Sequence, residues 1–97
     1  MQLSAAESTE LFVGNAEDPL QVVRVRYTGE PGPLVVEGDG LRSVGEPRPS
    51  FDGVLEVPVR VDNPTPGRRR AARVVAGGAV LDFEFEDAEP GALASSH

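Results

Sequence analysis

The chain has 97 residues, the size of one domain with one hydrophobic core, and its formal charge of −7 opposes binding to nucleic-acid phosphates. It has no Cys, which excludes disulfides and thiolate metal sites, while 11 Gly and 9 Pro argue against long helices. No apolar stretch is long enough to span a membrane, and the first residues lack the basic and apolar regions of a signal peptide. We expect a partner that is neither nucleic acid nor membrane; the localisation stays unknown.

The first third of the chain predicts a tail followed by two strands. Residues 1–10 show no apolar period, so we expect an N-terminal tail there, and a short strand at residues 11–13. Residues 21–28 alternate strictly, with Val23 and Val25 on one face and arginines on the other. This alternation predicts a half-buried strand whose valine face points towards the core.

The middle of the chain predicts short strands separated by turns. Two weak strand patterns cover residues 34–37 and 41–44, and Gly38-Asp39-Gly40 between them is typical of a tight turn. Residues 45–53 contain no apolar alternation and are predicted as a long turn segment. We therefore expect no strand between residue 44 and residue 54.

Residues 54–62 alternate four apolar side chains with polar ones and predict another half-buried strand. Pro58 lies within this strand and has no N–H to donate to a neighbouring strand. We expect either that the strand lies at a sheet edge or that Pro58 turns outwards at a bulge.

The carboxyl-terminal part predicts a hairpin with a defined register. Strand patterns at residues 69–76 and 81–86 flank Gly77-Gly78, a two-residue turn that tolerates positive φ. Ala76 should then lie opposite Ala79, with Phe83 and Phe85 on the core face. The same register places two opposite-charge pairs on the outer face, namely Arg73 with Asp82 and Arg69 with Glu86.

These elements together predict an all-β fold. About seven short strands in a chain of this size are typical of an antiparallel sandwich of the immunoglobulin-like or fibronectin-type-III-like kind. The predicted domain covers residues 11–87, and residues 88–97 are expected to form a carboxyl-terminal tail or linker.

The side chains that most enzymes use are missing. The chain has no Cys and no Lys, and its single His is His97 at the end, so nucleophilic triads and His-based zinc sites are excluded. Asp82, Glu84 and Glu86 alternate with the core-facing set and are expected to form a solvated outer face without the apolar pocket that acid–base catalysis needs. We expect no enzyme activity, no catalytic residue, no cofactor and no metal site.

Four residues remain as candidates for a partner surface. The only basic cluster is Arg68-Arg69-Arg70 with Arg73, and the hairpin register assigns partners to two of these arginines. Sugar-binding sandwiches usually present exposed aromatic rings, and two phenylalanines of this chain fall outside the predicted core faces. The candidate surface residues are Arg68, Arg70, Phe12 and Phe51.

Several segments resemble one family when they are taken as a set: Leu11-Phe12-Val13-Gly14, residues 19–25, residues 54–61, Phe83-Glu84-Phe85, and Ala88-Glu89-Pro90-Gly91. The set resembles the β-sandwich domain that precedes the catalytic domain in some bacterial α-mannosidase-type glycoside hydrolases. In that family Glu-Pro-Gly leads into a strand bearing a zinc-binding His-x-His, whereas here Glu89-Pro90-Gly91 leads into a segment ending at His97. The resemblance therefore implies an accessory domain, with no catalytic or zinc residue carried over.

The sequence thus predicts a non-catalytic accessory module of a larger bacterial glycoside hydrolase, which serves domain packing or spacing. The absence of Lys beside nine Arg fits a G+C-rich bacterial gene. Its expected partner is a neighbouring domain of the same polypeptide, and the module itself is expected to be a monomer. Two alternatives stay open: a module that binds carbohydrate, and an immunoglobulin-like adhesion repeat of a cell surface.

Overall fold

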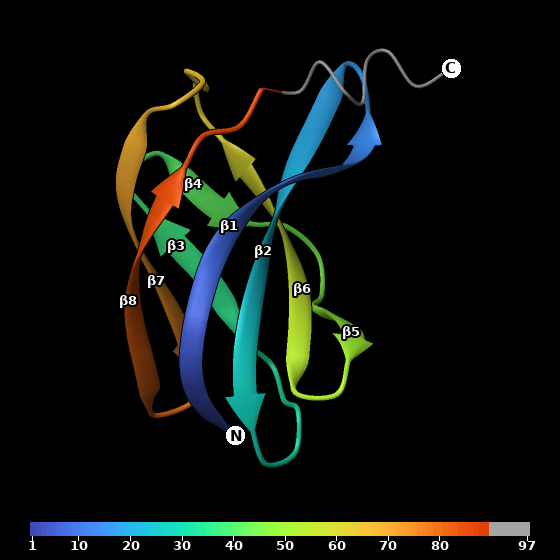
Figure 1. Ribbon diagram of the computed structural model, residues 1–97, viewed down its shortest axis with the longest axis vertical. Coiled ribbons are helices and arrows are strands. Elements are labelled where there is room, and N and C mark those ends of the chain that lie inside the picture. The colour runs from blue at the N-terminus through green and yellow to red at the C-terminus, as the bar shows by residue number, and fades with distance from the viewer. Residues whose placement is uncertain (90–97) are drawn as a thin grey trace.

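The computed structural model describes residues 1–89, and these form eight β-strands and no helix (Figure 1). The strands are β1 (Gln2–Asn15), β2 (Asp18–Thr28), β3 (Val35–Gly38), β4 (Leu41–Ser43), β5 (Arg48–Phe51), β6 (Val54–Val61), β7 (Arg69–Ala76) and β8 (Ala79–Glu86). Every pairing between them is antiparallel. The all-β, antiparallel class predicted from the sequence is confirmed, with eight strands rather than seven.

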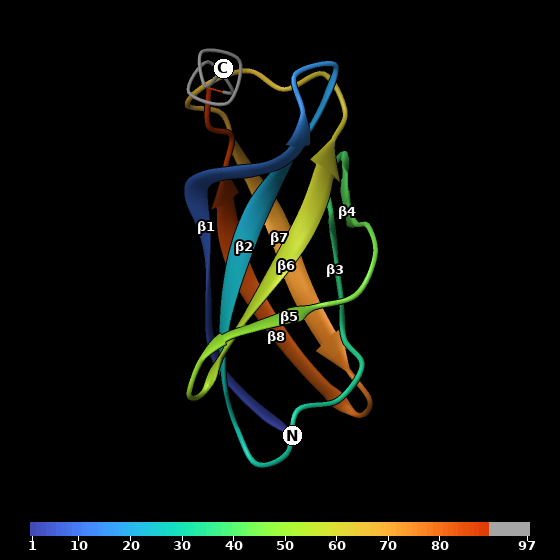
Figure 2. The same ribbon diagram turned by 90° about the vertical axis from the view of Figure 1, so that its right-hand side faces the viewer.

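The strands form one strongly curled sheet. Their order is β1-β2-β6-β4-β3-β7-β8, and β5 pairs with β6 beside β4. Because the sheet curls, β1, β2, β6 and β5 lie on one side of the molecule, while β7 and β8 lie behind them (Figure 2). The curl also brings β8 next to β1, so the two end strands of the sheet are neighbours (Figure 1).

The core between the two halves of the sheet is built mainly from valine. The alternating faces of β2, β6 and β7 point inwards, and β3 and β8 complete the enclosure. Of the five aromatic residues only Phe85 is fully buried, while Tyr27 and Phe83 pack against the core from its margin. The predicted core faces of these strands are confirmed. The buried apolar residues of the cluster are Val23, Val25, Leu34, Val36, Leu41, Leu55, Val57, Val59, Ala72, Val74, Ala76 and Phe85.

The prediction of a tail at residues 1–10 is wrong, because β1 begins at Gln2. Within residues 1–89 the strand pairs only with β2, and two register shifts interrupt the pairing. Such bulges break the period of two, so apolar and polar residues no longer alternate along β1. Of the predicted carboxyl-terminal tail only residues 88–89 are described; residues 90–97 lie outside the described part of the chain.

The prediction of a long turn at residues 45–53 is also wrong, since β5 lies within it. All four residues of β5 are exposed, so the strand has no apolar face that a sequence pattern could reveal. Its pairing with β6 shifts by one residue between Pro49 and Phe51. β5 is thus a short edge strand identified only by its backbone pairing.

Pro58 follows neither of the two predicted alternatives. β6 lies inside the sheet, between β2 on one side and β4 and β5 on the other, and no register shift occurs at Pro58. The Pro58 carbonyl accepts a hydrogen bond from the Val44 N–H at 2.9 Å, just beyond the end of β4. In an antiparallel strand the nitrogen of a residue points to the same side as its carbonyl oxygen. The Pro58 nitrogen therefore faces Val44, and this pair keeps only the hydrogen bond from the Val44 N–H, because proline has no N–H for the reciprocal bond; β4 ends at Ser43, just before this position.

The predicted hairpin register is confirmed over its full length. Ala76 lies opposite Ala79, and the pairing continues outwards to Arg69 opposite Glu86. Of the two turn glycines only Gly77 has a positive φ, at 60°, so the turn needs a glycine at the first position alone.

Candidate functional site

Three polar residues are buried among the 89 that the structure describes. Gln21 and Arg70 are each 3% exposed, and Asp87 is 2% exposed. Each lies two positions along the strand from a buried apolar residue: Gln21 and Arg70 come before theirs in the chain, and Asp87 comes after its own. All three therefore continue the inward faces of β2, β7 and β8. They form a polar layer at one end of the valine core, which we call the carboxyl-end clasp.

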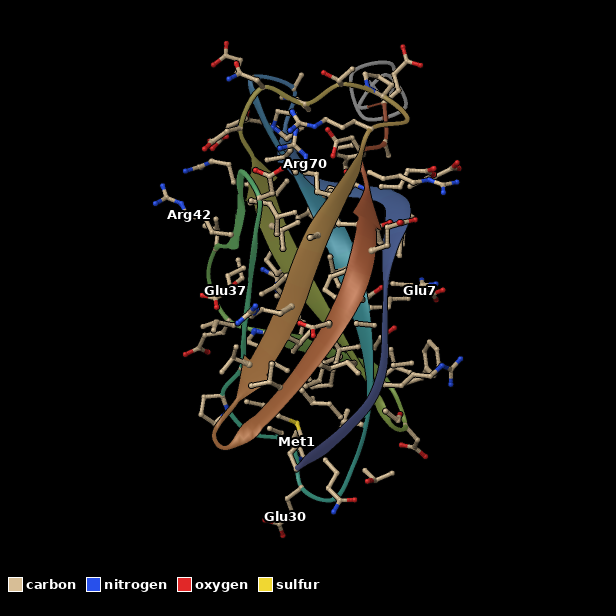
Figure 3. All side chains as sticks on the ribbon, turned by 90° about the vertical axis from the view of Figure 1, so that its left-hand side faces the viewer. Met1, Glu7, Glu30, Glu37, Arg42 and Arg70 are labelled. Atoms are coloured by element: carbon tan, nitrogen blue, oxygen red, sulfur yellow. The ribbon has the colours of Figure 1, made fainter. Side chains whose placement is uncertain are left out.

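The Arg70 guanidinium is the centre of the carboxyl-end clasp. It binds Asp87 in a bidentate manner, with Nε to Oδ1 at 2.8 Å and Nη2 to Oδ2 at 2.9 Å. Its remaining N–H groups donate to three backbone carbonyl oxygens, of Asp39 at 3.0 Å, Asp62 at 3.2 Å and Asn63 at 3.4 Å. Arg70 thereby joins the β3–β4 turn, the loop after β6 and the segment after β8 (Figure 3).

The Asp87 carboxylate has partners on both oxygens. Besides Arg70, the backbone N–H of Thr65 donates to Oδ2 at 2.9 Å. Burial alone would raise the pKa of Asp87, but the hydrogen bonds from Arg70 and Thr65 and the charges of Arg70 and Arg68 lower that pKa below its ordinary value. The hydrogen bond to Asp87 raises the pKa of Arg70 despite its burial. The pair is therefore fully charged at neutral pH.

Gln21 fixes the backbone on both sides of Asp87. Its Nε2 donates to the carbonyl oxygen of Glu86 at 2.9 Å, and its Oε1 accepts from the Ala88 N–H at 3.1 Å. The same Nε2 also donates to the carbonyl oxygen of Thr9 at 2.7 Å, within a bulge of β1. A single side chain from β2 thus connects β1 to the segment after β8.

The structure does not bring the four predicted surface residues together. The prediction that Arg70 belongs to a partner surface is wrong, because its side chain is buried in an ion pair and presents no surface to a partner. Arg68 is exposed and lies 3.4 Å from Asp39, Phe12 is half-buried in β1, and Phe51 in β5 is 55% exposed. Arg68 lies in the loop just before β7, whereas Phe51 lies in β5, in the other half of the curled sheet.

Asp87 and Gln21 were missed as functional residues, although a signal was present. The inward face of β8 contains Phe85, and two positions further along the same face the sequence has Asp87. On the paired strand, Arg70 lies opposite Phe85 and also faces inwards. Two opposite charges on one inward face indicate a buried ion pair, since burial of either one alone would be strongly unfavourable.

The carboxylates of β8 lie on its outer face, as predicted. Asp82 is 3.8 Å from Arg73, and Arg69 contacts both Glu84 at 3.4 Å and Glu86 at 3.9 Å. Within residues 1–89 no three His, Cys, Asp or Glu side chains are grouped so that they could hold a metal ion. The same residues contain no helix long and apolar enough to cross a membrane.

Comparison with known proteins identifies no relative: no protein-family model, no curated protein and no solved structure matches the chain. The resemblance to the accessory domain of bacterial α-mannosidases therefore stays a prediction from short sequence segments.

Proposed function

We propose that this chain is a non-catalytic immunoglobulin-like sandwich module that acts as a spacer or packing domain in a larger bacterial glycoside hydrolase. Its neighbouring domain in the same polypeptide would be the partner. The composition and the resemblance of the sequence segments support the glycoside hydrolase context. The strand order supports the immunoglobulin-like type, and two further features of the structure support the role of a spacer.

The order of the strands supports the immunoglobulin-like assignment. When β1 to β8 are lettered A, B, C, C′, D, E, F and G, one half of the sheet contains A-B-E-D and the other C′-C-F-G. This order matches the A-B-E-D and C-F-G sheets of the immunoglobulin sandwich with a C′ strand added, and the letters follow the order of the chain. Pairing of β4 with β6 joins the two halves along one side, which is a departure from a fully separated sandwich.

The direction of the chain through the molecule supports a spacer. Met1 lies at one end of the longest axis, and the segment after β8 leaves at the opposite end (Figure 1). The molecule measures 37 × 26 × 17 Å along its principal axes. A module of this shape would hold the domains on its two sides apart by a distance close to its longest dimension of 37 Å.

The carboxyl-end clasp is the observation that carries the proposal. A bidentate ion pair, a backbone hydrogen bond from Thr65 and the amide of Gln21 all bind the segment from Glu86 to Ala88. So many buried polar contacts on the last residues of a domain fix the direction in which the chain leaves it. A fixed exit is needed in a module that sets the orientation of the next domain.

The test compares the product of the natural reading frame with a form that lacks this module. Deletion should lower the melting temperature of the adjoining domain or reduce its soluble yield. In the full protein Asp87→Asn should broaden the distribution of inter-domain distances measured by X-ray scattering, whereas Asp82→Asn on the exposed face should not. A reading frame without a second domain, or a neighbour unaffected by the deletion, would refute the proposal.

A further inference from the structure

The outer face of β1, β2, β6 and β5 contains a small hollow beside the exposed Phe51. Phe51 lies opposite Val54, Val54 opposite Arg26, and Arg26 opposite Ala5, so one row of side chains crosses four strands. The hollow has a volume of about 200 Å³. Its lining includes Ala5, Glu7, Arg24, Arg26, Phe51 and Val54.

The apolar part of this hollow suits the flat face of a ring. Phe51 is 55% exposed, whereas Val54, which lies opposite it on β6, is only 1% exposed. An aromatic ring held at the rim of a shallow hollow offers a large contact area and loses little side-chain entropy on binding. The small Ala5 side chain on the far side of Arg26 leaves the hollow open to a ligand.

The polar part of the hollow offers both donors and acceptors. Arg26 is exposed and makes no hydrogen bond or ion pair within residues 1–89, so its five N–H groups are available. Glu7 points away from β1 and supplies carboxylate acceptors (Figure 3). Arg24 is held at 3.3 Å by Glu56 on the neighbouring strand. Hydroxyl groups, which donate and accept at once, complement such a set.

The charges around the hollow favour a neutral ligand. Of the lining side chains, Arg24 lies opposite Glu7 and is paired with Glu56, so within residues 1–89 Arg26 is the one unpaired charge of the hollow. A single anionic group could pair with Arg26, but a longer anionic polymer would be repelled by the net charge of −7 on the molecule. A polyanion is for this reason the less suitable ligand.

From these observations we infer that the hollow is a binding subsite for one neutral pyranose ring of a polysaccharide. The ring stacks on Phe51, and its hydroxyl groups bind Arg26 and Glu7. One ring makes few contacts, so we expect a dissociation constant on the order of 1 mM. The inference is independent of the spacer role, and either can fail without the other.

The test is a titration of the ¹⁵N-labelled chain, followed by amide chemical shifts. The probes are neutral oligosaccharides of mannose, glucose, galactose and xylose, with oligogalacturonate as the charged comparison. At least one neutral oligosaccharide should shift the amides of Ala5, Arg26, Val54 and Phe51. Phe51→Ala should weaken that binding about tenfold or more, because the stacking surface is lost. Arg26→Gln should weaken it less.

Val80→Ala is the matched control, because Val80 is 58% exposed on the other half of the sheet and lies outside the hollow. It should leave the dissociation constant unchanged. The amide spectrum of each variant reports whether it is folded. The inference is overturned if no neutral oligosaccharide binds at tens of millimolar, if Phe51→Ala binds like the unaltered chain, or if only oligogalacturonate binds.

Discussion

Arg70 and Asp87 form the one ion pair of the described chain in which both side chains are buried, at 1% and 0% exposed. Taking two charges out of water is costly, and the mutual attraction offsets that cost only if the geometry is good and the other polar atoms are satisfied. Both conditions hold here, because the contact is bidentate and no buried side-chain nitrogen or oxygen in residues 1–89 lacks a partner. The pair therefore specifies the position of the last segment more than it adds net stability.

Removal of one partner tests this interpretation. Arg70→Met leaves the Asp87 carboxylate buried without its counter-charge, so we expect the free energy of unfolding to fall by about 3–5 kcal/mol. Arg73→Met is the matched control, because its partner Asp82 is 81% exposed, and we expect a loss of at most about 1 kcal/mol. Urea unfolding of both variants measures the difference. Equal effects would contradict the assignment of Arg70 to the clasp.

The lowered pKa of Asp87 makes stability depend on pH in a defined direction. The unfolded chain, in which Asp87 has its ordinary pKa of 3.8, binds a proton more readily than the folded chain does. The contribution of Asp87 to the free energy of unfolding is thus complete above pH 3.8. It is lost as the pH falls through the lower pKa that Asp87 has in the folded chain. We expect the stability difference between the unaltered chain and Asp87→Asn to be largest at neutral pH and to narrow below pH 3.8. A difference that stays constant from neutral pH into this acid range would contradict the account.

At the scale of the strands, charge selects the register. On one half of the sheet, Glu7, Arg24, Glu56 and Arg48 lie opposite one another across β1, β2, β6 and β5, with alternating sign. On the other half, Arg42, Glu37, Arg73 and Asp82 do the same across β4, β3, β7 and β8. A slip of one residue in any pairing would break such a row and turn an inward face outwards. Each pair contributes little energy, but together the pairs favour a single alignment.

The approach of β3 to β7 depends on Gly38. A Cβ atom at this position would lie 2.5 Å from the carbonyl oxygen of Ala71 and 2.9 Å from the Cα of Ala72, both on the backbone of β7. We expect Gly38→Ala to force the strands apart and to lower the free energy of unfolding by about 1–3 kcal/mol. Gly78→Ala is the control, since nothing lies within 4 Å of its added Cβ, and its effect should stay within about 0.5 kcal/mol. Thermal unfolding of the two variants measures the difference. Equal stability of Gly38→Ala and Gly78→Ala would contradict the role of Gly38 in the approach of β3 to β7.

How far the sequence predicts each strand depends on how strongly the strand is buried on one face. β7 and β8 were predicted with the correct register because their inner faces are apolar and their outer faces carry matched charges. β5 and the first part of β1 could not be predicted, since an exposed edge strand has no apolar period and bulges shift its faces.

The clasp was predictable in part. Arg70 and Asp87 occupy inward positions that a period of two identifies, but their common partner Gln21 is brought to them only by the curl of the sheet. The hollow beside Phe51 depends in the same way on pairing with β5, which no pattern in the sequence indicates. The sequence predicts that Phe51 is exposed, but it does not predict that Arg26 and Glu7 lie beside it.

At the scale of the molecule, the curl places the two end strands of the sheet side by side, so that each lies against the edge of the other. β1 and β8 lie beside each other, and the Ser8 hydroxyl accepts a hydrogen bond from the Glu86 N–H at 3.0 Å across this seam. β5 is also an edge strand, but it is short and contains Pro49, and both features disfavour pairing with another chain. With a net charge of −7, we expect a monomer below about 100 µM. A dimer that persists on dilution in sedimentation velocity experiments would show that an edge does pair.

We propose that the chain contributes surface and orientation but no chemistry. The most direct measurement is the rate at which the purified chain hydrolyses aryl glycosides, aryl esters and peptides. We predict no turnover above that of buffer, because the chain has no Cys or Lys and its carboxylates on β8 lie on a solvated outer face. Turnover that survives repurification and disappears when Asp82, Glu84 or Glu86 is replaced by its amide would contradict the claim.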